Sequence, residues 1–128
     1  MLVEVPLGDV VDRVTILLLK ERHLSDEGAL ANVRRELTAL GQAWRGEGHA
    51  PMQRLPQWAE LSEVNGALWS VEDALREHEV EGDFGPEFVA LARSVYQLND
   101  RRAALKRAIS LSLGSQLVEE KSYAGTGS

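Results

Sequence analysis

Polar side chains interrupt the apolar faces of the helices that this sequence predicts, and they are the first candidates for chemistry. Across 61–75, steps of three and four residues place Asn65 and Glu72 on the face that carries the leucines. Across 95–109, the same spacing places Arg102 among apolar residues. Because a buried charge without a partner costs several kcal/mol, we expect these groups to meet one another, water or a ligand.

The sequence predicts that such groups converge inside the protein. Counted out from the turn between the two segments, Asn65 lies roughly opposite Arg102, and Asp12 can approach from the first predicted helix. The expected polar cluster consists of carboxylates, amides and cations, namely Asp12, Asn65, Glu72, Asp73, Asn99, Arg102 and Lys106.

Two functions fit such a cluster, and the sequence leaves open whether the protein is an enzyme. In the leading interpretation the cluster is structural, as single buried polar groups are in coiled coils. The protein is then a non-enzymatic interaction module that forms a homo-oligomer, most simply a dimer sealed by Leu7, Trp44 and Trp58. In the alternative, a bundle pocket binds or converts an anionic small molecule with Glu72, Arg102 and Lys106.

Composition argues against several other classes of protein. The chain has no cysteine, which predicts a reducing cytoplasm and excludes disulfides and thiolate metal sites. Its three histidines lack metal-ligand spacing, so we expect no metal and no cofactor. A formal net charge of −6 disfavours nucleic acid as a partner. The longest apolar run, 14–19, broken only by Thr15, is far shorter than the about 20 residues that cross a membrane.

Four helical segments must position these groups. Apolar residues recur at helical spacing over four stretches, about 8–24, 27–45, 55–80 and 86–113. The segment 46–51 has two glycines and a proline, and it divides the chain into two helical hairpins. The prediction is therefore an all-α antiparallel bundle of four helices, with a short extended N-terminal arm and a flexible C-terminal tail.

Charge predicts which helices are neighbours. Residues 54–81 hold two basic and seven acidic side chains, whereas residues 86–113 hold five basic and two acidic ones. A short turn joins the two segments, so they must pack antiparallel, and their opposite charges favour this pairing. We expect one helical-bundle domain over residues 1–123 and a disordered tail over 124–128, where all side chains are small.

Five stretches carry a distinctive combination of residues: 8–17 (GDVVDRVTIL), 32–37 (NVRREL), 65–73 (NGALWSVED), 91–106 (LARSVYQLNDRRAALK) and 119–123 (EEKSY). Together they resemble an uncharacterised family of short bacterial and phage helical proteins, known only as a domain of unknown function. The resemblance covers nearly the whole chain. It implies a loose link to surface-polysaccharide metabolism and brings no catalytic residues to this sequence.

Overall fold

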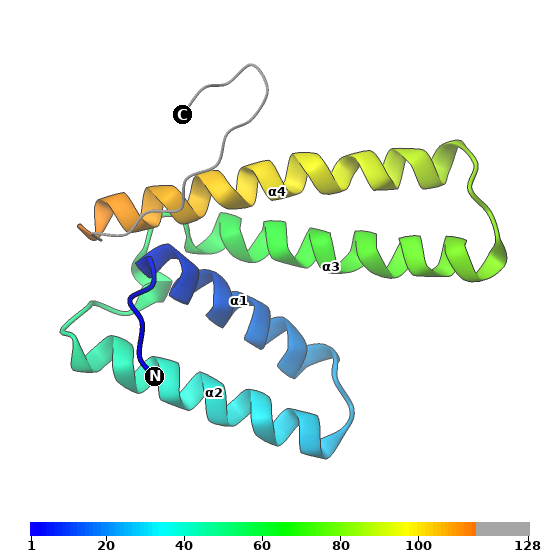
Figure 1. Cartoon of the computed structure of the whole chain (residues 1–128). Helices are drawn as coiled ribbons and strands as arrows, with labels where there is room; N and C mark the ends of the chain where they lie inside the picture. The colour runs from blue at the N-terminus through cyan, green and yellow to red at the C-terminus, as the bar shows by residue number, and fades with distance from the viewer. Residues whose placement is uncertain (115–128) are drawn as a thin grey trace.

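The computed structural model describes residues 1–114, which form two helical hairpins (Figure 1). The first hairpin consists of α1 (Leu7–His23) and α2 (Glu27–Gly46), and the second of α3 (Trp58–Glu81) and α4 (Pro86–Ser112). A short 3-10 helix, η1 (Met52–Arg54), lies between the hairpins. The prediction of an all-α protein with two antiparallel hairpins is confirmed. The expected tail at 124–128 lies outside the described residues.

Local signals in the sequence explain where most helices begin and end. The Asp26 carboxylate accepts a hydrogen bond of 2.8 Å from the backbone N–H of Ala29 and so caps α2. Gly82 ends α3 in a left-handed conformation, with φ of 71°. Pro86 occupies the first turn of α4, where its fixed φ suits the helix and its missing N–H leaves no bond unmade.

The start of α3 differs from the prediction. The expected helix begins near residue 55, but α3 begins at Trp58. Leu55 has an extended backbone, with φ of −64° and ψ of 137°. The ring of Pro56 disfavours helical geometry at the residue before it, so the chain extends at Leu55 before α3 starts. The residues immediately upstream form η1 instead.

The first helix is the centre of the fold. α1 contacts α2 on one side and both α3 and α4 on the other, and more of its residues are buried than in any other described helix. The main core is a cluster of buried apolar side chains: Val11, Val14, Trp44, Met52, Leu61 and Ile109. Because α2, α3 and α4 all pack against α1, its position determines which polar groups can meet.

Gly8 allows α1 to approach α4 at backbone distance. A Cβ atom at this position would lie 2.0 Å from the backbone oxygen of Lys106, which no side chain can tolerate. The N–H of Gly8 donates a hydrogen bond of 2.8 Å to Ser110 Oγ. Glycine is therefore required here because two helix backbones touch.

The α3–α4 hairpin extends beyond the helix that covers it (Figure 1). Its fully buried residues lie only near the crossing with α1, namely Leu61, Val64, Asn65, Leu68, Ile109 and Ser110. Between Trp69 and Ala108 no residue is buried. We call residues 72–95, which include the turn, the distal hairpin. Within residues 1–114 it is a two-helix layer with no third helix packed against it (Figure 1).

No helix in the described part of the chain is both long enough and apolar enough to cross a membrane. The residues before α1 form an arm without regular secondary structure. Its apolar side chains, Met1, Leu2, Val3 and Val5, are exposed.

Candidate functional site

Asp12 is the centre of a buried polar cluster where α1 crosses α3 and α4. Arg102 donates two hydrogen bonds to its carboxylate, from Nε to Oδ1 at 2.8 Å and from Nη2 to Oδ2 at 2.5 Å. Asn65 Nδ2 donates to Asp12 Oδ1 at 2.9 Å and to Thr15 Oγ1 at 2.8 Å. Thr15 Oγ1 in turn donates to the backbone oxygen of Asp12 at 2.7 Å. A single carboxylate thus joins three helices.

The donors around Asp12 occupy both oxygens of its carboxylate. The Asp12 side chain is only 6% exposed, and a two-point guanidinium pair holds it. Asn65 supplies a further donor to the same carboxylate. The geometry therefore suits holding α1, α3 and α4 at a fixed register.

Two further contacts join α1 to α4 on the same side as the Asp12–Arg102 pair. Lys106 Nζ lies 3.2 Å from Asp9 Oδ1, and the Lys106 side chain is only 13% exposed. The hydrogen bond from Gly8 to Ser110 lies one turn further along α4. We call these contacts the α1–α4 ladder: Gly8–Ser110, Asp9–Lys106 and Asp12–Arg102.

The acids predicted on α3 do not join this cluster. Glu72 and Asp73 have half-exposed side chains, and both face Arg76 of their own helix, Asp73 Oδ1 at 3.0 Å from Arg76 Nη1. The expectation that Glu72 lies on a buried face is wrong, because its side chain is 55% exposed and no residue of α3 beyond Leu68 is fully buried. Asn99 is half-buried, and no hydrogen bond within the described residues joins it to the Asp12 cluster.

Trp44 lies in the core of the first hairpin. It is 5% exposed, and its Nε1 donates a hydrogen bond of 2.7 Å to the backbone oxygen of Ala50. The expectation that Trp44 seals a dimer interface is therefore wrong. Leu7 and Trp58 are partly buried and pack against the same core cluster.

A second charged pair joins α1 to α2. Arg13 Nε donates to Glu36 Oε2 at 2.6 Å, and Arg13 Nη2 donates to Glu36 Oε1 at 2.9 Å. This hydrogen bonding lowers the pKa of Glu36 and raises the pKa of Arg13. Both side chains are more than a third exposed, so solvent screens the pair.

The histidines are separated in space as they are in sequence. Each packs against a different aromatic ring, His23 on Trp69, His49 on Trp44 and His78 on Phe88. Within residues 1–114, no group of three or more histidine, aspartate and glutamate side chains is placed to hold a metal ion.

Comparison with known protein families shows to which family the chain belongs. One family model, described as "Family of unknown function (DUF6165)", matches residues 1–128. The chain belongs to this family. The predicted resemblance to an uncharacterised helical family is thus confirmed. No curated protein and no solved structure matches the chain. For this DUF6165 member, functional inference therefore depends on the geometry of its own residues.

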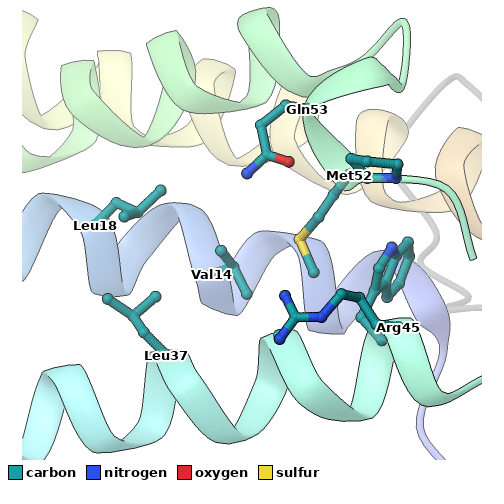
Figure 2. A pocket seen from close by; sticks show the side chains of 9 residues that line it. Val14, Leu18, Leu37, Arg45, Met52 and Gln53 are labelled. Atoms are coloured by element: carbon teal, nitrogen blue, oxygen red, sulfur yellow. The ribbon is translucent and has the colours of Figure 1, made fainter.

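The DUF6165 structure also holds a pocket that helical periodicity did not predict. Its volume is about 270 Å³, and it lies between α1, α2 and η1 (Figure 2). Apolar side chains form most of its lining, and Arg45 and Gln53 are its polar members. One signal in the sequence could have indicated it: Gly41, a glycine in the interior of α2, forms part of the wall.

Proposed function

We propose that this protein is a non-enzymatic helical module that binds a second copy of itself through its α3–α4 hairpin. The supporting observation is that no residue between Trp69 and Ala108 is buried. This stretch nevertheless carries large apolar side chains at helical spacing, including Leu75, Phe88, Leu91, Val95 and Leu98. An apolar helix stripe is stable when it packs against another layer, and a two-helix hairpin has only one.

The contacts of the polar cluster support a structural role for the groups that lie between α1, α3 and α4. Asp12 is engaged by Asn65 and Arg102, as expected for a buried network that fixes helix register. The enzyme alternative requires Glu72 beside Arg102 and Lys106. Glu72 instead faces Arg76 at the surface of α3, which disfavours that alternative.

Charge favours one arrangement of the two copies. Residues 72–91 hold seven acidic side chains and one basic one, whereas residues 93–113 hold five basic and one acidic. Two hairpins packed with their tips together would place like charges side by side. An antiparallel two-fold arrangement avoids this repulsion and places each acidic tip near the end of α4 that has a net positive charge. Because Arg101, Arg102 and Lys106 already pair with acids of their own chain, the charges decide the orientation and do not supply new ion pairs. We therefore propose an antiparallel four-helix interface.

Exposed apolar residues indicate the face of α4 that we expect at the interface. Val89 and Tyr96 are seven residues apart and so share one face of the helix. Tyr96 is 74% exposed, which is unusual for a large aromatic side chain without a partner. Val80 and Phe84, at the tip, are exposed as well. Burial of such aromatic and aliphatic side chains would provide most of the binding energy.

Sedimentation equilibrium of the wild type and of Val89→Glu/Tyr96→Glu tests this proposal. We expect a wild-type dimer, and a double variant that is monomeric with unchanged helix content, because both side chains are exposed in the monomer. Ala31→Glu/Ala39→Glu, an equal charge change at two exposed sites on α2, is the control and should stay dimeric. A wild type that is monomeric up to sub-millimolar concentration contradicts the proposal, and so does a double variant that remains a dimer.

We further propose that the module works in the cytoplasm and without a nucleic-acid partner. The lack of cysteine supports a reducing compartment. The net charge of −6 opposes binding to a phosphate backbone. Fractionation of cells that express the chain tests the first point, and a gel shift with an oligonucleotide at low salt tests the second.

A further inference from the structure

We propose that the pocket between α1, α2 and η1 binds a small carboxylate with an apolar body, of the size of a medium-chain fatty acid. The site lies on the first hairpin, away from the surface proposed for self-association. The two proposals therefore stand or fall independently. Three features of the pocket support this ligand: its size and lining, the exposed polar side chains of Arg45 and Gln53 at its edge, and the glycine in its wall.

The lining selects an apolar ligand body. Val14 and Leu18 of α1 face Leu37 of α2 across the space, and Met52 of η1 closes one side (Figure 2). The volume of about 270 Å³ equals roughly nine water molecules at about 30 Å³ each. It lies just below the usual range for drug-sized ligands, about 300–1,000 Å³. A chain of about eight carbons fits such a space better than a nucleotide or a sugar chain.

The polar side chains at the pocket favour a ligand that carries a negative charge. The Arg45 guanidinium and the Gln53 amide point toward the space from opposite sides (Figure 2). The residues that line the pocket include no acid, and no ion pair joins Arg45 to an acid within residues 1–114. A guanidinium pairs with a carboxylate through two parallel hydrogen bonds, and the Gln53 amide offers a further donor.

Gly41 keeps the wall of the pocket open. It lies in the interior of α2, where glycine is a poor helix former. Packing does not require it, because an added Cβ would meet only Arg45 Nη1, at an ordinary contact distance of 3.7 Å. A larger side chain would occupy the space between Arg45 and the apolar lining. The glycine thus lowers helix stability and preserves the cavity.

A pair of matched probes tests the charge preference. We titrate the protein with octanoate and with 1-octanol, which share an apolar chain, and follow backbone amide signals by NMR. We expect octanoate to shift the signals of Val14, Leu37 and Met52, and octanol to bind about tenfold more weakly. Arg45→Met should remove this preference. Arg35→Met, on the same helix but outside the lining, should keep it.

A second pair of variants tests whether the ligand occupies the space beside Gly41. Gly41→Leu should abolish the shifts with both probes, whereas Gly46→Leu should leave them unchanged, because nothing lies within 4 Å of a Cβ at Gly46. Melting curves establish that both variants are folded, and if Gly41→Leu is not, Arg45→Met decides. The proposal is overturned if octanoate shifts no pocket signal at millimolar concentration, if octanol binds as well as octanoate, or if folded Gly41→Leu still binds.

Discussion

Asp12 and Arg102 lie ninety positions apart in the chain and form a two-point hydrogen-bonded ion pair. The Asp12 side chain is 6% exposed, and the Arg102 side chain is 29% exposed. The pair therefore joins the first hairpin to the second at a point that water barely reaches. Its loss would leave a charge without a partner in the interior.

Replacement of Arg102 by methionine tests how much the pair stabilises the fold. Methionine keeps much of the apolar stem and removes the charge, so Asp12 would lose both guanidinium hydrogen bonds. We expect Arg102→Met to lower the free energy of unfolding by about 3–5 kcal/mol. Chemical denaturation at fixed protein concentration measures this change.

The neighbouring arginine provides the control. Arg101 Nη2 lies 2.9 Å from Glu60 Oε1, and both side chains are at least half exposed. Arg101→Met should therefore change the free energy of unfolding by only about 0–1 kcal/mol. Equal changes in the free energy of unfolding would show that the buried Asp12–Arg102 pair stabilises the fold no more than the exposed Glu60–Arg101 pair does.

A double-mutant cycle separates the ion pair from general damage to the core. Asp12→Asn removes the charge that Arg102 pairs with, and Arg102→Met removes the charge that Asp12 pairs with. The double variant contains neither charge. We expect it to be at least about 1 kcal/mol more stable than the sum of the single effects predicts. Strict additivity in denaturant titrations would argue against direct coupling.

Gly8 should be the glycine least tolerant of substitution in the described part of the chain. An alanine Cβ would collide with the backbone of α4 at Lys106, so α1 would have to move away. We expect Gly8→Ala to destabilise the protein by about 1–3 kcal/mol. Gly46→Ala, with open space around its Cβ, should be neutral or slightly stabilising. Thermal melts of the two variants side by side give the comparison.

The Arg13–Glu36 pair predicts a small pH dependence with a definite sign. Glu36 is bonded to Arg13, which lowers its pKa below the ordinary value of 4.5. Its contribution to stability is therefore present above about pH 4.5 and is lost as the pH falls through the lowered pKa. Glu36→Gln should melt below the wild type at pH 7, and the two melting temperatures should converge as the pH falls below the lowered pKa of Glu36. A difference that grows in acid would contradict this assignment.

Much of the fold could be predicted because its signals are local. Asp26, Gly82 and Pro86 mark helix ends through interactions within a few residues. The opposite charges of α3 and α4 favoured their pairing, and Glu60 and Arg101 form one such contact. The extended backbone at Leu55 was missed because a proline can also be accommodated in the first turn of a helix.

The polar cluster could be predicted only in part, because it depends on how one hairpin crosses the other. Helical spacing correctly placed Asn65 and Arg102 on faces that meet, and Asp12 beside them. The same spacing placed Glu72 on that face as well. Periodicity shows which face of a helix is apolar, but it does not show how far along the helix a neighbour covers it. The crossing of α1 ends before Glu72.

The α1–α4 ladder has a consequence for the speed of unfolding. Its hydrogen bonds join residues that are 90 and 102 positions apart, whereas each hairpin forms from contacts close in sequence. Because closing a long loop costs more entropy than closing a short one, we expect the hairpins to form early and the ladder to form after the rate-limiting step. A substitution that removes one of these contacts would then accelerate unfolding and leave the refolding rate nearly unchanged. The ladder would thus set the lifetime of the native state.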